Sequence, residues 1–397
     1  MKVTKKVQTF GLALGLVLLL GQGAAATIYN WQTGQPIPGT EGITPQPGVN
    51  LSFWNTSSHN LKYGDFRSTD LHGSNFYYSW LDYAHFGGAN LTSADLYQAT
   101  LTDADLTDAV VRGADFGRAT SRGFTKEQLY STASWKAKDL TDMGLSWNDL
   151  SGWNLAGQNL TLADLWRATL TGADLTGADL TNAYLYQATL TGADLSGADL
   201  SSANLSYATL TGANLTSANL TRATLTGADL TLADLRKAKG ALLTAAITRN
   251  TILPDGTVAG LNLLAGDTLI IRNCDLAVTV QSAMTLAQGS EMEFLLDNVW
   301  GSAVTAATGV VPDLGGILYL GFADGIDPGT LVGQTFDIFN WSGPLDAGNR
   351  FDDVRSEWPL WDLGALYTTG EVTLLPEPAT LSLLALGGLA LLRRRRR

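Results

Sequence analysis

The sequence predicts an all-β protein in which a long β-solenoid precedes a smaller β-rich module. The first observation is a period of five residues: 20 consecutive leucines stand at spacing five from Leu140 to Leu235. Ala usually stands two residues before each Leu, Asp or Asn one before, and Thr or Ser one after. Neither a helix nor a flat strand keeps every fifth residue on one side, whereas a regularly bending coil does. The second observation is that this period ends near Gly240, where short apolar segments between Gly, Asp and Pro begin.

A second, longer period of four repeats is superimposed on the first. The segment Leu165–Gly172 is followed at this spacing by similar segments that begin at Leu185 and Leu205. The motif A-(D/N)-L-(T/S)-x resembles that of the pentapeptide-repeat family. The resemblance implies a right-handed, quadrilateral β-helix with one pentapeptide per side and four per coil. Five such coils would stack to roughly 24 Å at a strand spacing of ~4.8 Å.

The repeat predicts which side chains face the interior. The central Leu and the Ala two before it point inward, while Asp, Asn, Thr and the variable residue face water. Each buried Leu contributes on the order of 1.5–3 kcal/mol relative to exposure. Backbone hydrogen bonds run from coil to coil, so an open end of the stack requires a cap.

The same period organises most of the chain. An earlier block spans residues 61–116, preceded by a linker or cap at 27–60, and the regular block spans 139–239. Between them, residues 117–138 break the register by one residue. There Thr125 and Gln128 fit a capping box that opens a short helix, which predicts an excursion between two solenoid blocks.

Residues 240–375 are predicted to form a separate β-rich module, either a small sandwich or an irregular continuation of the solenoid. Short apolar segments bounded by Gly, Asp and Pro indicate its strands. The predicted strands are Thr268–Arg272, Leu276–Val280, Ser290–Leu296, Gly316–Phe322, Thr335–Trp341 and Glu371–Leu375.

The two ends of the sequence predict export. Lys2, Lys5 and Lys6 precede an apolar run, and Ala24 and Ala26 fit a signal-peptide cleavage site, which assigns residues 1–26 to a signal peptide. Residues 376–397 resemble a PEP-CTERM sorting signal. Its parts are the motif Pro376, Glu377 and Pro378, an apolar stretch, and the cluster Arg393, Arg394, Arg395, Arg396 and Arg397.

The sorting resemblance implies processing by an exosortase in a Gram-negative bacterium, with transient anchoring in the inner membrane and delivery to the cell surface or extracellular matrix. The apolar stretch from Ala379 to Leu392 is shorter than the ~20 residues that a stable spanning helix needs. The arginines place the tail on the cytoplasmic side. The alternative is an ordinary C-terminal membrane anchor.

Composition restricts the partners. The 397 residues carry a net charge of −12 and a single cysteine, Cys274, so an intrachain disulfide is excluded. Acidic walls repel nucleic acid and attract cations or basic partners. Extracellular polysaccharide or envelope proteins are therefore the expected partners, and nucleic acid is not.

A search for catalytic and cofactor motifs predicts no enzyme, no catalytic residue, no cofactor and no metal site. The histidines His59, His72 and His85 occupy different repeat positions, which argues against a shared metal. Two alternatives stay open for the second module: Ca²⁺ bound by loop aspartates, and a sugar platform built from tryptophans that otherwise pack in the core. The aspartates are Asp324, Asp327, Asp346, Asp352 and Asp353; the tryptophans are Trp300, Trp341, Trp358 and Trp361.

The sequence is thus interpreted as a non-enzymatic, exported structural or interaction protein of the cell envelope or matrix. One alternative is a ligand wall for polysaccharide or ice, made by stacked threonines: Thr169, Thr171, Thr189, Thr191, Thr209 and Thr211. Another is a gyrase-binding DNA mimic, which the family resemblance suggests and the signal peptide disfavours. A matrix-modifying carbohydrate enzyme would need a carboxylate pair that the sequence does not reveal.

Overall fold

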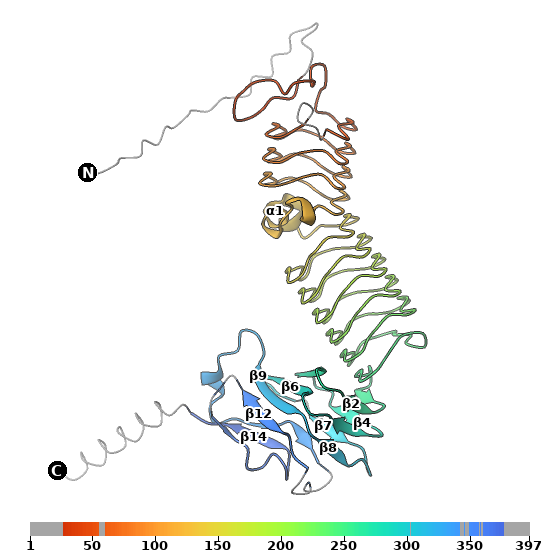
Figure 1. The fold of residues 1–397 in the computed structure, drawn as a ribbon, viewed down its shortest axis with the longest axis vertical. Coiled ribbons are helices and arrows are strands. Elements are labelled where there is room, and N and C mark those ends of the chain that lie inside the picture. Colours follow the sequence, from red (N-terminus) through yellow and green to blue (C-terminus); the bar gives the residue numbers. More distant parts are fainter. Residues whose placement is uncertain are drawn as a thin grey trace, which may run out of the picture.

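The computed structural model describes residues 27–54, 60–301, 303–341, 345, 349–356, 358 and 360–376. In Figure 1 these residues form a long stack of coils, at whose middle α1 (Lys126–Ser131) bulges outward, and then a second module of β-strands. The fold is mostly β, and its solenoid followed by a β-rich module confirms the predicted class.

One pentapeptide shows why the repeat bends. Leu170 and Ala173 are buried (0% and 1% exposed), and the Ala173 N–H donates to the Leu170 carbonyl at 3.1 Å. Between them Gly172 has a φ of +61°, in the left-handed region that a type II turn requires at its third residue. The Asp174 carboxylate then accepts the N–H of Thr176 at 3.0 Å. Each recurring feature of the motif therefore has a local cause: two residues fill the core, one permits the turn and one caps the next turn.

Successive coils pair as parallel β-bridges between residues four repeats apart, for example Asp174 with Asp194. The Leu175 N–H donates to the Asp194 carbonyl at 2.7 Å, and the Asp194 N–H donates to the Ala173 carbonyl at 2.9 Å. This pairing confirms four pentapeptides per coil.

The solenoid interior is filled throughout. The 20 leucines from Leu140 to Leu235 are at most 3% exposed. In the first block, phenylalanines take the central position on two sides: Phe66 stacks on Phe86 with ring centroids 4.8 Å apart, and Phe76 meets both edge to face at 5.7 Å. The core is closed and mostly apolar, with a few polar side chains such as Ser79, Asn148 and Gln158 at the Ala position, so the exposed polar groups lie on the outer walls.

The short helical excursion predicted between the blocks is present. It consists of η1 (Thr120–Arg122), α1 (Lys126–Ser131) and α2 (Ala133–Lys136). The predicted capping box opens α1, because the Thr125 hydroxyl accepts the Gln128 N–H and the Gln128 carboxamide accepts the Thr125 N–H.

This excursion is packed into the solenoid and does not interrupt the stack. Leu129 of α1 is fully buried in the same core as the leucines of the repeats. The Ala133 N–H donates to the Ala109 carbonyl at 2.9 Å, and Asp115 pairs with Gly144 across the insertion. The coil that joins these two residues is therefore longer than its neighbours, with helices in place of part of its wall.

The solenoid begins earlier than Leu61. Asn50 pairs with Asn75, and Leu51 is fully buried, so the first coil begins within the segment that the sequence assigned to a linker or cap. Ahead of it, Asn30 forms an antiparallel bridge with Gly64. The segment that forms this bridge covers an edge that would otherwise expose unpaired backbone groups.

The module after residue 252 is a second β-solenoid, which decides between the two open alternatives. Three sheets of parallel strands run through it, in the orders β1-β4-β7-β11, β2-β5-β8 and β12-β9-β6-β3. Paired residues lie between 22 positions apart (Thr257 and Thr279) and 36 positions apart (Ile317 and Asp353), so its coils vary in length. Repeat pairing of the first solenoid continues to Ile252, beyond the boundary predicted near Gly240.

A small antiparallel sheet, β10-β14-β13, closes the second module. The six predicted strands are present, with Thr335–Trp341 divided into β10 and β11, and β1, β2, β5, β7, β8, β12 and β13 were not predicted. The strands are β1 (Thr257–Val258), β2 (Leu261–Leu263), β3 (Thr268–Arg272), β4 (Val278–Val280), β5 (Met284–Leu286), β6 (Glu291–Leu296), β7 (Val304–Ala306), β8 (Pro312–Leu314), β9 (Ile317–Phe322), β10 (Thr335–Asp337), β11 (Phe339–Asn340), β12 (Asp353–Ser356), β13 (Trp361–Asp362) and β14 (Glu371–Leu374), with η2 at Pro328–Leu331.

Candidate functional site

The threonines of the predicted ligand wall are stacked in register. Thr169 pairs with Thr189, and Thr189 with Thr209, as parallel bridges. The second rank aligns through the turns, where the Gly172 N–H donates to the Thr191 carbonyl at 2.9 Å. Thr171 is exposed and the other five threonines are half-buried. Asp149 and Asp229 pair with the outer rungs, so the wall is three rungs long.

Two of the five loop aspartates of the second module have clear structural roles. Asp327 accepts the Gly329 N–H at 2.9 Å and caps η2, while Asp353 pairs with Arg355 at 2.8 Å. Asp324 lines a cleft described below, and Asp346 lies outside the described residues. Within the described part of the chain, no group of three His, Cys, Asp or Glu side chains is placed to hold a metal ion.

The two described histidines lie on different sides of the coil. His72 contacts Asp70 (3.2 Å between Nδ1 and Oδ1), and His85 contacts Asp105 one coil further on (3.0 Å between Nε2 and Oδ2). His59 is outside the described residues. Each described histidine therefore has its own carboxylate partner.

The tryptophans of the second module pack with its core. Trp341 is 8% exposed and donates its indole N–H to the Leu366 carbonyl at 2.7 Å. Trp300 and Trp358 are partly buried and donate to the carbonyls of Asp337 and Leu375. Trp361 donates to the Ser356 hydroxyl at 2.7 Å. This arrangement agrees with core packing.

A buried ion pair joins the two solenoids. Arg236 is fully buried and binds the carboxylate of Asp234 through Nε and Nη2, at 3.0 and 2.6 Å. Its guanidinium also donates to the carbonyls of Leu276 (2.9 Å) and Arg272 (2.8 Å) in the second module. Asp234 and Arg236 belong to the last regular coil, so this pair fixes the second module to the end of the first.

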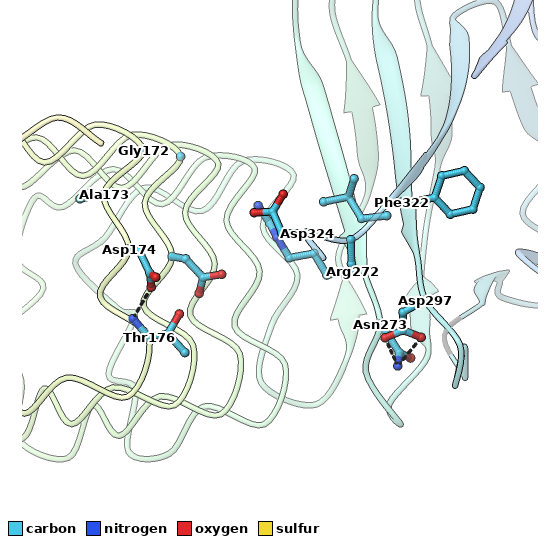
Figure 2. A pocket seen from close by; sticks show the side chains of 13 residues that line it. Gly172, Ala173, Asp174, Thr176, Arg272, Asn273, Asp297, Phe322 and Asp324 are labelled. Atoms are coloured by element: carbon cyan, nitrogen blue, oxygen red, sulfur yellow. Dashed lines mark hydrogen bonds between the residues drawn. The ribbon is translucent and has the colours of Figure 1, made fainter. Parts of the chain in front are cut away.

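Next to this ion pair, a cleft of about 700 Å³ separates the solenoid wall from the ends of β3, β6 and β9. Figure 2 shows Asp174 and Thr176 on the solenoid side and Arg272, Asp297 and Asp324 on the other. Burial lowers the pKa of the Arg272 guanidinium, while the carboxylates of Asp194, Asp234 and Glu293 oppose this shift. The cleft is therefore polar and holds charges of both signs.

The carboxylates of this cleft bond to their own neighbours. Asp174 accepts the Thr176 N–H, and Asp297 accepts both contacts from the Asn273 carboxamide, at 2.9 and 3.1 Å, as the dashed lines of Figure 2 mark. Two of the carboxylates that line the cleft are therefore already engaged in hydrogen bonds within their own module.

Several predicted sites fall outside the described residues. These are the cleavage residues Ala24 and Ala26 and, in the sorting signal, Glu377, Pro378 and Arg393 to Arg397; of the motif, the structure describes Pro376. Among the described helices, none has the length and apolar character that crossing a membrane requires.

Together these features define a class: a right-handed quadrilateral β-helix with a closed apolar interior and polar outer walls. Within that class the chain belongs to the pentapeptide-repeat family. The family described as pentapeptide repeats matches in eight copies, within residues 69–108, 84–120, 149–185, 178–216 and 198–237.

Solved structures of other pentapeptide repeat proteins resemble this chain. One from the Arabidopsis thaliana thylakoid lumen is 42% identical over 23% of this chain and 63% of its own, with a TM-score of 0.23. HetL, involved in heterocyst differentiation regulation in the cyanobacterium Nostoc sp. strain PCC 7120, is 31% identical over 53% and 91%, with a TM-score of 0.22. Rfr23 from the cyanobacterium Cyanothece 51142 is 31% identical over 26% and 82%, with a TM-score of 0.22. No curated protein matches the chain.

Sequence reasoning missed two features of these surfaces. The Asp234–Arg236 pair breaks the repeat rule that Asp faces water, and the signal was an Arg directly after a repeat centre at the end of the block. The second missed feature is a set of aromatic residues that follow the repeat centres on one side of the solenoid, although these residues recur near every fourth repeat.

Proposed function

We propose that this protein is a non-enzymatic, exported scaffold or interaction protein of the cell envelope or extracellular polymer matrix of a Gram-negative bacterium. The basic and apolar N-terminal segment and the Pro376–Arg397 segment support export and processing by an exosortase. Transient inner-membrane association through the C-terminal segment precedes release. Envelope proteins or polysaccharide are the partners.

The observation that carries the scaffold role is the filled interior of the solenoid. Mainly Leu, Phe and Ala close it along its described length, so a partner meets rigid walls on which side chains repeat in register. Such walls suit binding, because a rigid element presents groups without an ordering cost. A DNA-mimic role toward gyrase fits the acidic walls but not export.

The export proposal is tested by the mass of the protein in its host. Cell fractions are separated and the intact mass of the protein in each is measured. We expect the exported form to start near Thr27 and to lack Arg393–Arg397. A variant with Pro376→Ala and Pro378→Ala should keep its tail and stay with the membrane fraction. A full-length C-terminus on the exported protein would overturn the sorting step, and a cytoplasmic location would overturn export.

The threonine wall supports a second candidate function, binding of polysaccharide or ice. Its specific support is the alignment of two hydroxyl ranks over three rungs, ~4.8 Å apart. We expect the variant Thr189→Lys with Thr191→Lys to lose ice shaping or retention on matrix polymer. The matched control, Thr161→Lys with Thr181→Lys, places the same charges on another side. If the wild type shows neither activity, the threonines of the wall have only a structural role as residues that favour β-structure.

A further inference from the structure

One corner of the first solenoid carries a continuous row of aromatic and hydrogen-bonding side chains. It consists of the two residues that follow each repeat centre on the side from Leu51 to Leu225, and we call it the aromatic corner. Backbone bonds link its rungs without a gap, from the Phe53 N–H to the Tyr77 carbonyl (2.8 Å) through to the Tyr207 N–H and the Thr226 carbonyl (2.9 Å). Nine rungs span about 38 Å.

The N-terminal part of the aromatic corner is a stack of rings. Phe53 contacts Tyr77 and Tyr78, with centroids 5.3 and 6.0 Å apart. Tyr77 lies nearly parallel to Tyr97 on the next rung, at 5.8 Å and 7°. Gly117 of the following rung leaves room for the Tyr97 ring, since a Cβ there would lie 2.5 Å from Tyr97 Cδ2.

The middle of the corner offers unused hydrogen-bonding atoms. Gln98 is 7% exposed, and its side-chain oxygen has no hydrogen-bond partner among the described residues. On the next rung, the Nε atom of Arg118 also has no hydrogen-bond partner among the described residues. The Arg118 guanidinium lies 4.4 Å from the Trp147 ring centroid. Buried polar atoms without partners are costly, so a side-chain rotation that brings this acceptor or donor to a ligand hydroxyl would recover a hydrogen bond.

The C-terminal part repeats the pattern of ring and polar group. Trp147 and Trp166 lie 5.5 Å apart, and Arg167 covers both rings at 4.7 and 5.6 Å. Arg167 also donates to the Gln187 side chain at 2.6 Å. Tyr207, 55% exposed, meets Tyr186 edge to face at 5.6 Å.

The corner keeps these rings at a conformational cost. Phe53, Tyr78, Trp147 and Tyr207 have φ of +59° to +61°, at the turn position where other repeats hold Gly. A bulky residue is strained there, and other corners hold non-Gly residues in the same conformation, such as Tyr63, Leu162 and Arg222. The core does not need these rings, because the centres and alanines already fill it.

We propose that the aromatic corner binds an extended, uncharged polysaccharide chain that lies along the solenoid axis. Pyranose rings present apolar faces that pack on aromatic rings and hydroxyls that bond to Gln and Arg side chains. The rung spacing is close to the length of one pyranose unit. No carboxylate occurs in the two positions of any rung from Ser52 to Gly227, although the chain is acidic.

The adjoining wall carries negative charge beside the arginines of the corner. Asp95, Asp115 and Asp164 stand on this wall, immediately before the centres Leu96, Phe116 and Leu165. Their charge repels single-stranded nucleic acid, which would otherwise stack on such rings. This binding site deepens the proposed function, on whose polysaccharide partner it rests, and its binding can be measured whether or not the chain is exported.

The test is affinity electrophoresis of the full-length protein in gels that contain hydroxyethylcellulose, with dextran gels and a single-stranded DNA oligonucleotide as separate probes. The variant Trp166→Thr, Tyr186→Thr, Tyr207→Gly uses residues that neighbouring repeats already place at these positions, so the fold is retained. Three lost ring contacts should weaken the dissociation constant for hydroxyethylcellulose at least about tenfold.

Leu162→Gly is the matched control, since Leu162 is 52% exposed and at the same turn position on another corner. It should bind as the wild type does. Binding of the DNA in place of both glucans, equal loss in Leu162→Gly, or no retardation of the wild type would each overturn the proposal. Export measured by intact mass is unaffected by any of these outcomes.

Discussion

At the scale of single residues, the aspartates of the walls are not equivalent. Most cap a turn, and where neighbours donate freely the carboxylate is favoured: the hydroxyl and N–H of Ser151 lower the pKa of Asp149. Asp115 is the opposite case. Burial, together with the carboxylates of Asp95 and Asp164, raises its pKa, even though the Gly117 N–H donates to it at 2.7 Å.

This difference predicts the effect of Asp115→Asn. A raised pKa in the folded state means that the native protein binds more protons than the unfolded chain between the usual and the raised value. Stability therefore falls as pH rises through that window, and the full penalty remains at pH 7. Asn keeps the acceptor for Gly117 and removes the charge. We expect the melting temperature at pH 7 to rise by about 1–4 °C, with no gain at pH 3.

The control is Asp149→Asn, at the same repeat position. Its lowered pKa stabilises the fold above the usual value and loses that effect as pH falls, so this variant should melt at or slightly below the wild-type temperature at pH 7. Circular dichroism across pH 3–8 measures both variants. Equal shifts in the two would contradict the assignment of Asp115 as a buried, repelled carboxylate.

The inward positions of Leu and Ala could be predicted from the sequence, because a period of five residues fits only a coil in which these two residues face the interior. Sequence reasoning did not reach the turn-capping bond of Asp174, because a carboxylate in a polar wall looks solvated until the next turn is built. Nor did it find Arg236, whose buried position depends on carbonyls of the second module, 36 and 40 residues further along the chain.

At the scale of elements, local signals were the reliable ones. The Thr125–Gln128 capping box predicted α1 because both partners lie within one helical turn. That Leu129 would reach the solenoid core was not predictable, since it depends on the coils above and below. In the second module, β3, β6 and β9 were found because their apolar residues alternate over five or six positions, whereas β1 and β13, of two residues each, were missed.

The junction between the two solenoids gives a prediction at this scale. Arg236→Met leaves the Asp234 carboxylate buried without its partner and two carbonyls without donors. Breaking such a pair costs about 3–5 kcal/mol, and we expect an early unfolding transition of the second module. Hydrogen exchange of residues 257–296 should rise well above that of residues 160–220.

Two variants serve as controls for the junction. Lys237→Met removes an ion pair with Asp275 in which both side chains are exposed, and such pairs contribute about 0–1 kcal/mol. The double variant Asp234→Asn with Arg236→Met removes both buried charges and should recover part of the loss. If Lys237→Met and Arg236→Met unfold alike, the buried pair is not what joins the modules.

At the scale of the whole molecule, the first solenoid was predictable and the second was not. The strict period of five in the first solenoid is compatible with one fold. The coils of the second solenoid differ in length, so its sequence has no period to detect. The threonine wall was found because Thr is frequent in both ranks. The aromatic corner was not, because its rings shift between two adjacent positions and the spacing lengthens at two insertions.

Because successive coils pair in parallel, the solenoid can lengthen or shorten without misaligning its walls only by complete coils. Adding or deleting four repeats would change the height of the column by one rung and leave every wall in line. A single repeat would instead turn everything beyond it by a quarter revolution, carrying the second solenoid and half of the aromatic corner to another face. The long coil between Asp115 and Gly144 absorbs its helical insertion and returns to the same side. Growth by tandem duplication is thus compatible with a continuous binding corner when the copied unit is a full circuit.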